Sequence, residues 1–271
     1  MKYLTASSIA FAILALGPAL TAQGAQGQGR GQTSPQTAQA AAPIDLTGYW
    51  VSIVTEDWRW RMVTPPKGDY SSVPLSAEGR RVADTWDPAK DDREGNACRA
   101  YGAAGIMRVP GRVHITWDNE NTLKIETDAG TQTRLLRFED VQAPAGDQGW
   151  QGFSKAAWEI AGGTGGGRGG GGGGRGGAPA NPPPGPRFGS LKVVTTNMKP
   201  GYLRKNGVPY SETAAVTEYF DRHSESNGDE WFTVTTTVDD AKYLNMPFIT
   251  STSFKKERDG AKWRATPCTA Q

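Results

Sequence analysis

The sequence has few of the residue types from which catalytic and metal sites are usually built. It contains two histidines, His114 and His223, and two cysteines, Cys98 and Cys268, among 271 residues. No H-x-H, H-E-x-x-H or closely spaced Cys/His group occurs, which argues against a dedicated zinc site. No G-x-S-x-G, Walker or dinucleotide-binding glycine pattern occurs in the required strand-to-helix context. We therefore expect no metal and no cofactor.

Charge of one sign and long apolar runs are also scarce. Lysine and arginine number 30 and aspartate and glutamate 28, so the charge balance indicates no nucleic-acid partner. The one long apolar run, residues 4–20, is short for a bilayer span, which needs about 20 apolar residues. It follows Lys2 and ends near small residues, as a secretory signal does. We predict a signal peptide over residues 1–22, cleaved after Ala22 or alternatively Ala25. An N-terminal membrane anchor is the other interpretation.

This prediction places the mature chain in the periplasm or outside the cell, with no membrane span. In such an oxidising compartment two cysteines most simply form one disulfide, Cys98–Cys268. Because the closed loop is long, the chain-entropy treatment gives a stabilisation of about 4–5 kcal/mol. The alternative is two free buried thiols.

Two segments contain almost no large apolar side chains. Residues 23–43 are mainly Gln, Ala, Gly, Ser, Thr and Pro, and residues 161–187 are glycine runs followed by a proline-rich stretch. Neither has side chains whose burial would offset the entropy cost of ordering, so we predict a disordered leader and a disordered insert. The stretches 158–160 and 191–194 look like partner strands. We therefore place the insert at a hairpin tip inside a single domain, residues 44–271, rather than at a domain boundary or in a nucleic-acid arm.

Apolar and polar residues alternate through most of residues 44–271, which is typical of half-buried strands. Residues 112–117 and 123–126 flank a turn-forming stretch and predict a hairpin. One helix is predicted from Ser76, an N-cap residue, to Trp86, where Asp87-Pro88 would stop it. The pattern predicts an all-β fold, an antiparallel closed or nearly closed barrel with one short helix; a sandwich is the alternative. The further predicted strands are residues 58–62, 131–138, 153–160, 190–196, 211–222, 230–238, 248–256 and 262–265.

Short motifs between residues 95 and 268 resemble a broad group of secreted, functionally uncharacterised bacterial β-rich proteins. The resemblance implies an exported β-rich protein with a tight turn where this chain has its Gly/Pro insert, and it implies no reaction. Tyr210 and Phe153 stand where these relatives have histidine-containing motifs, so this chain would lack any chemistry of those histidines. The matching stretches are CRAYG at 98–102, WE at 158–159, LKVVTT at 191–196, YSE at 210–212, VTEY at 216–219 and DD at 239–240.

A second resemblance is to lipocalin-like barrels. Gly48-Tyr49-Trp50 is similar to the G-x-W motif with which lipocalins open their first strand. The resemblance implies a calycin-like barrel in which Trp50 closes the floor.

Glu218 is the most informative ionisable residue. With period two it shares a strand face with Val216 and Phe220, so its carboxylate is expected to be partly buried and to need a cationic partner. The candidates on predicted strands are Arg59, Arg61, Arg134 and Arg137. The pair would either stabilise the barrel or form the polar end of a ligand cavity.

The remaining candidate residues have equally plain structural interpretations. Glu218 and His114 are weak candidates for a general base, and His114 is otherwise a half-exposed strand residue. The stretch 56–61 is dense in Trp and Arg, residue types that stack on and fork onto ligands, but the same alternation describes a half-buried strand. As ligand-binding candidates we name Trp58, Trp60, Arg61, Arg137 and Glu218.

Three functions remain open at this stage. The favoured one is an exported barrel that binds a small apolar or amphipathic ligand in a cavity lined by aromatic residues. The second is a lyase, isomerase or hydrolase on the same barrel that uses an internal carboxylate. The third is a structural envelope protein that binds no ligand.

Overall fold

The computed structural model describes residues 36–146, 149–161 and 188–271 as one compact unit. The predicted signal peptide, residues 23–35 of the predicted leader and residues 162–187 of the predicted insert lie outside the described residues. None of the helices in the described part of the chain is long and apolar enough to cross a membrane.

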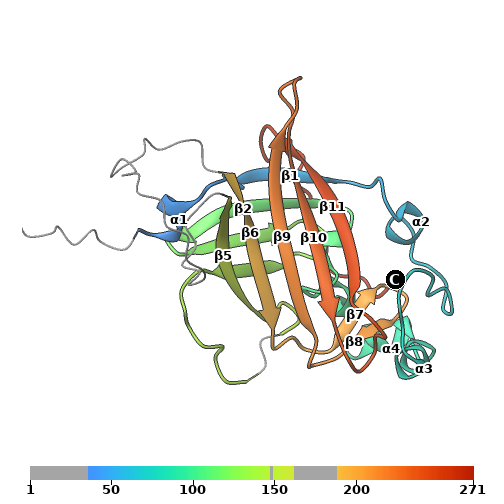
Figure 1. Ribbon diagram of the computed structural model, residues 1–271. Helices are drawn as coiled ribbons and strands as arrows, with labels where there is room; N and C mark the ends of the chain where they lie inside the picture. Colours follow the sequence, from blue (N-terminus) through green and yellow to red (C-terminus); the bar gives the residue numbers. More distant parts are fainter. Residues whose placement is uncertain (1–35, 147–148, 162–187) are drawn as a thin grey trace, which may run out of the picture. The chain divides into compact units, whose positions relative to one another are not determined.

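Nine strands in the described residues close into a barrel, as the sequence pattern predicts (Figure 1). Around the barrel the strands follow the order β1-β11-β10-β9-β6-β5-β4-β3-β2. Most neighbours in the barrel are also neighbours in sequence, and short turns join β2 to β3, β3 to β4 and β9 to β10. The strands are β1 (Gly48–Ile53), β2 (Arg112–Asn119), β3 (Thr122–Thr127), β4 (Thr133–Arg137), β5 (Phe153–Ala161), β6 (Phe188–Thr196), β9 (Ala215–Ser224), β10 (Glu230–Asp239) and β11 (Phe248–Glu257).

One pair of neighbours departs from the predicted antiparallel pattern. Strands β4 and β5 run parallel, with Leu136 opposite Ser154 and Arg137 opposite Lys155. A closed ring with an odd number of strands cannot alternate in direction all the way round, so at least one pair must be parallel. The connection between β4 and β5, residues 138–152, supplies the crossover that a parallel pair needs.

The described chain contains more helix than the single segment that was predicted. Ser76 caps α3 (Ala77–Ala83) as expected, and its hydroxyl accepts from Gly79 N. The helix ends at Ala83, and the predicted stop Asp87-Pro88 instead begins α4 (Pro88–Arg93), because Asp87 is a good N-cap and proline suits the first helical position. The other short elements are α1 (Ala38–Ala41), α2 (Trp58–Arg61), the 3₁₀ helices η1 (Ala97–Tyr101) and η2 (Ile106–Arg108), and the hairpin β7 (Gly201–Arg204) and β8 (Val208–Tyr210).

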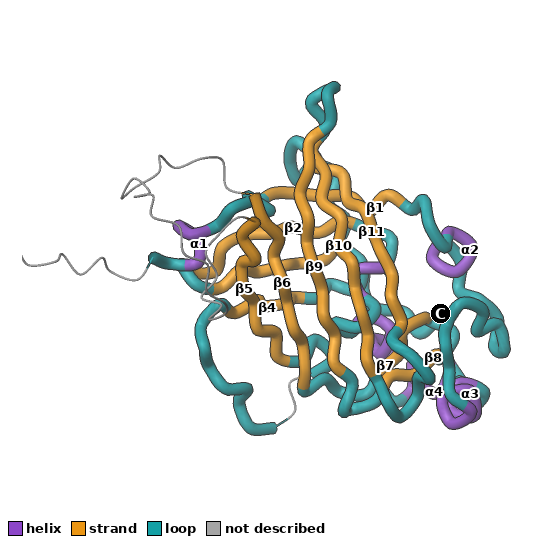
Figure 2. Tube along the Cα trace, in the orientation of Figure 1, coloured by secondary structure: helices purple, strands orange, loops and turns teal. Residues whose placement is uncertain are grey.

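Figures 1 and 2 show α1 at one end of the barrel and the remaining helices with β7 and β8 at the other. The α1 end corrects the predicted leader, because residues 36–43, which were predicted to be disordered, are described and include α1. Ala38 is buried, its amide donates to Asn121 Oδ1 over 2.9 Å, and its carbonyl accepts from Trp158 Nε1 over 2.8 Å. These contacts offset the ordering cost of a segment that is weakly apolar in sequence.

Three predicted strands are wrong or shifted. Residues 58–61 form α2 and Met62 is its C-cap; the helix begins after Asp57, which has a left-handed conformation (φ 50°). Alternation of Trp and Arg over so few residues does not distinguish a strand from one helical turn. Residues 262–265 are not a strand; beside them an isolated bridge joins Ala129 and Thr266. Strand β9 begins at Ala215 and not at Ser211.

The barrel interior is filled with packed side chains. Trp50, Phe220, Phe232 and Phe254 are fully buried, and the ring centroids of Phe232 and Phe254 lie 4.7 Å apart. Trp50 meets Phe232 edge to face at 4.9 Å and donates through Nε1 to Leu46 O. Aromatic packing of this kind contributes beyond simple area burial, so it stabilises the barrel closure.

The disulfide predicted between Cys98 and Cys268 is present, with a Cα–Cα distance of 5.1 Å. It joins η1 to the C-terminal tail, residues 258–271, across 170 positions of sequence. The tail is thereby held against the end of the barrel that also carries α2, η1, η2 and β7.

Candidate ligand-binding pocket

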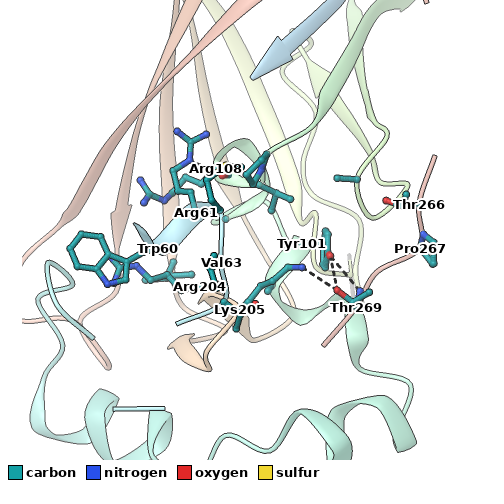
Figure 3. A pocket seen from close by; sticks show the side chains of 18 residues that line it. Trp60, Arg61, Val63, Tyr101, Arg108, Arg204, Lys205, Thr266, Pro267 and Thr269 are labelled. Atoms are coloured by element: carbon teal, nitrogen blue, oxygen red, sulfur yellow. Dashed lines mark hydrogen bonds between the residues drawn. The ribbon is translucent and has the colours of Figure 1, made fainter. Parts of the chain in front are cut away.

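A pocket of about 410 Å³ lies at this end of the barrel (Figure 3). Four stretches that are distant in sequence build it: residues 60–64 in and after α2, residues 100–110 in η1 and η2, residues 203–205 at the end of β7, and residues 266–269 of the tail, with Ala129 between them. We call it the end pocket. Its lining residues are Trp60, Arg61, Met62, Val63, Thr64, Ala100, Tyr101, Gly105, Arg108, Val109, Pro110, Ala129, Leu203, Arg204, Lys205, Thr266, Pro267 and Thr269.

Much of the wall is apolar. Ala100 and Leu203 are buried core residues, while Val63 is 70% exposed and forms part of the rim. Figure 3 shows Arg61, Arg108, Arg204 and Trp60 gathered on one side of the pocket, with Tyr101 and Thr269 on the other. A surface that is apolar with a few grouped polar side chains is typical of small-molecule sites.

Arg61 lines the pocket and is held in place by several partners. Its Nε donates to Arg108 O over 2.9 Å, its Nη2 donates to Ser52 Oγ over 2.9 Å, and its Nη1 pairs with the Glu56 carboxylate. Burial and the positive charge of Arg108 lower the pKa of Arg61, while Glu56 opposes that shift. Its donors are largely occupied within the protein.

Arg108 is buried but only partly satisfied. Its Nη2 donates to Asp57 Oδ2 over 2.8 Å, and its guanidinium lies 5.7 Å from the ring centroid of Phe248. Its Nη1 is buried and has no hydrogen-bond partner among the described residues.

Arg204 is the least compensated charge of the three. Its Nη1 donates to Ser71 O over 2.7 Å and its Nη2 to Ser72 Oγ over 3.4 Å, both neutral acceptors. It forms no ion pair with a carboxylate of the described residues, and its buried Nε has no hydrogen-bond partner there. Burial and the nearby charge of Arg108 lower the pKa of Arg204 to about 10. The side chain is therefore still protonated at neutral pH.

Lys205, Tyr101 and Thr269 form the other side of the pocket. Lys205 Nζ lies 5.0 Å from the Tyr101 ring centroid and donates to Thr269 Oγ1 over 3.1 Å. Burial works to raise the pKa of Tyr101, but hydrogen bonding to Lys205 and Thr269 outweighs it and lowers the pKa. These contacts attach the tail to η1 next to the disulfide.

The structure brings two of the predicted ligand-binding residues to the pocket, Trp60 and Arg61. Trp58 is 66% exposed on the outside of α2. Arg137 lies on the outer face of β4, with its guanidinium 5.0 Å from the Phe153 ring centroid. Glu218 lies in the barrel interior, away from both. The predicted set is therefore distributed over separate places.

The Glu218 carboxylate is paired as expected, and its partner is Arg134. Arg134 Nη1 and Nη2 donate to Glu218 Oε1 and Oε2 over 3.1 and 2.6 Å, and both side chains are fully buried. Thr195 Oγ1 accepts a further bond from Arg134 Nη2. A carboxylate engaged in this way has both oxygens occupied.

His114 lies on the outer face of β2, because its neighbours Val113 and Ile115 are buried in the barrel. Its ring stacks on Tyr49 with centroids 4.0 Å apart, and Nδ1 is 3.5 Å from Glu126 Oε2. In the described part of the chain no group of three or more His, Cys, Asp and Glu side chains is placed to hold a metal ion.

Sequence reasoning missed Arg108 and Arg204, the pocket-lining arginines that each have a buried donor without a partner in the described residues. Arg204 precedes a turn of composition Lys-Asn-Gly, and Arg108 falls in a short 3₁₀ helix. The sequence offers one signal for these two residues: each is an arginine outside the stretches in which apolar and polar residues alternate.

In comparisons with known protein families, curated proteins and solved structures, nothing matches this chain. What the end pocket binds is therefore inferred from its own chemistry.

Proposed function

We propose that this chain is an exported β-barrel binding protein that holds a small amphipathic molecule in the end pocket. The observation that carries the proposal is the pocket itself, about 410 Å³, with an apolar wall and arginines grouped on one side. Its volume falls within the range of about 300–1,000 Å³ that is usual for small-ligand sites.

The proposal moves the site from the barrel interior, where the sequence placed it, to the barrel end. Trp50, Phe232 and Phe254 occupy the interior and contact one another. The buried Arg134–Glu218 pair supports a structural role for that carboxylate and not a role as a base or as a ligand anchor. A lipocalin-like relationship remains part of the proposal, supported by the burial of Trp50 at the start of the first strand.

Export is supported by the disulfide between Cys98 and Cys268, because such bonds persist mainly in the periplasm and outside the cell. The predicted signal peptide and the resemblance to secreted β-rich proteins agree with this location.

A second candidate, a structural envelope protein without a ligand, is favoured by the filled interior. The two candidates differ in whether the end pocket is occupied in the native host.

Native mass spectrometry of the protein purified from its own host tests the proposal. We expect a bound small molecule that is lost on denaturation. Thr266→Trp places an indole at an exposed pocket-lining position and is expected to abolish the adduct. Ser251→Trp, at an exposed position on the outer face of β11, is the matched control and is expected to retain it. A bare wild-type protein would favour the structural candidate. An adduct that survives Thr266→Trp would mean that the molecule binds outside the end pocket, which would overturn the proposal.

A further inference from the structure

Arg204 is a buried positive charge without an ion-pair partner in the described residues. It is 5% exposed, and its guanidinium lies 5.0 Å from the Trp60 ring centroid and 6.0 Å from that of Phe248. Burying a charge is costly unless it is paired and hydrogen-bonded. Aromatic rings and two neutral oxygens offset only part of that cost.

A second buried cation lies beside it. Arg108 packs on the same Phe248 ring as Arg204, so two guanidinium groups share one aromatic contact. Like charges at short range in a poorly solvated site repel each other. The lowered pKa of Arg204 reflects its burial first and the charge of Arg108 second.

The nearby carboxylates are already engaged. Asp57 pairs with Arg108, and Asp69 pairs with Arg59 and accepts from Trp60 Nε1. In the residues that the structure does not describe, Asp147 is the only acidic side chain. The straightforward source of a compensating negative charge is therefore a molecule from outside the chain.

We propose that the ligand of the end pocket carries an oxyanion group and that Arg108 and Arg204 bind it. This inference rests on the proposed function and adds the chemical class of the ligand. Both side chains line the pocket, and each has a buried donor without a hydrogen-bond partner in the described residues, Nη1 in Arg108 and Nε in Arg204. Guanidinium groups suit carboxylate, sulfate and phosphate because their planar forks match the spacing of two oxyanion oxygens.

The apolar part of the ligand has its own place. Val63, Ala100 and Val109 line the pocket together with the arginines. An anionic head at Arg108 and Arg204 would leave a short apolar body against these side chains. The class that fits is a small amphipathic carboxylate, sulfate or phosphate ester.

Isothermal titration calorimetry of the full chain with decanoate, decyl sulfate and decanol tests the inference. The three probes share an apolar body and differ in the head group, so the two anions also distinguish carboxylate from sulfate recognition. We expect at least one anion to bind about tenfold tighter than decanol.

Arg204→Met removes the charge and keeps apolar bulk. It is expected to reduce the preference for the anion over decanol to less than about threefold. Arg204→Lys keeps the charge without the fork and provides a second variant if Arg204→Met does not fold; an intermediate preference is expected. Arg59→Met is the matched control, because Arg59 also lies over Trp60, at 5.6 Å, but is exposed and paired with Asp69.

A spectroscopic readout separates direct contact from a loss of stability. The Nε–H signal of Arg204 in a ¹⁵N-arginine spectrum should shift on addition of the bound anion and not on addition of decanol.

The outcomes separate the two proposals. Equal affinity of wild type for decanol and both anions, or full anion preference in Arg204→Met, would overturn the oxyanion inference and leave the pocket as a binding site. Failure of all three probes to bind wild type, or binding that Thr266→Trp does not weaken, would overturn the proposed function and this inference with it.

Discussion

Arg134 on β4 and Glu218 on β9 form a two-bond ion pair across the barrel interior, with β5 and β6 between their strands. Both side chains are fully buried, and Thr195 and Ser154 continue the hydrogen-bonded network with an Oγ1–Oγ distance of 2.7 Å. The pair therefore links non-adjacent strands through the barrel core.

Removing one member of this pair should be strongly destabilising. Arg134→Met or Glu218→Leu leaves the other charge buried and uncompensated, and each is expected to lower the free energy of unfolding by about 3–5 kcal/mol. The double variant should lose much less than the sum, because no charge remains in the core. Urea unfolding of the four proteins gives the coupling. Single substitutions that cost less than about 1 kcal/mol would show that the pair is dispensable.

The disulfide should stabilise both the fold and the end pocket. Because Cys98–Cys268 closes a long loop, Cys98→Ser/Cys268→Ser is expected to lower the free energy of unfolding by about 2–5 kcal/mol. Thr266 and Thr269 line the pocket beside Cys268, so a loosened tail should also weaken ligand binding. Unfolding with and without dithiothreitol checks this. The reductant should bring wild type to the level of the double variant and leave the variant unchanged.

The same substitution should have opposite effects at two tyrosines. Tyr210 is fully buried, its hydroxyl has no hydrogen-bond partner in the described residues, and a Cβ at Gly102 or Gly201 would lie within 2.6 Å of that oxygen. Tyr210→Phe is expected to leave stability unchanged or raise it by about 1 kcal/mol. Tyr202→Phe removes the bonds to Asp91 and Arg99 and should cost about 1–3 kcal/mol. A destabilised Tyr210→Phe protein in thermal unfolding would indicate a partner for that hydroxyl.

Stability should decline in alkaline solution partly through Tyr202. Burial raises the pKa of Tyr202 to about 12, against the opposing charge of Arg99, whereas an unfolded tyrosine titrates near about 10. The unfolded chain therefore loses this proton first as pH rises. The tyrosine's contribution is full below about pH 10 and is lost towards about pH 12, with a slope of at most about 1.4 kcal/mol per pH unit.

Urea midpoints of wild type and Tyr202→Phe across this alkaline range isolate the effect, because lysines titrate in both proteins. Parallel pH profiles would contradict the assignment. The difference between the absorbance titrations of wild type and Tyr202→Phe gives the pKa of Tyr202.

Much of the strand framework follows from local sequence pattern. In β2 and β3 the alternation of apolar and polar residues reports directly which side chains are buried, and Ser76 caps α3 through a bond to a residue three positions away. Glu218 was assigned to an inward face on the same basis. With only two cysteines in the chain, a single intramolecular pairing was available.

Other features could be decided only by the tertiary structure. Residues 58–62 fit a strand or a helical turn equally well, and the contacts of Arg61 with Glu56, Ser52 and Arg108 accompany the helix. The parallel pair of β4 and β5 follows from the number of strands that close the ring. Neither the helical turn nor the parallel strand pair can be predicted from a local repeat in the sequence.

The end pocket shows the difference most clearly. Period and composition describe how one residue relates to its near neighbours. They therefore predicted most of the barrel strands, one helix cap and the inward-facing carboxylate of Glu218. Whether the charge of Arg204 is compensated depends on Arg108, Phe248 and Asp69, which reach it from other parts of the chain. The residues that surround Arg204 are brought together by long-range packing. A local sequence pattern therefore cannot indicate that its charge lacks a partner among the described residues.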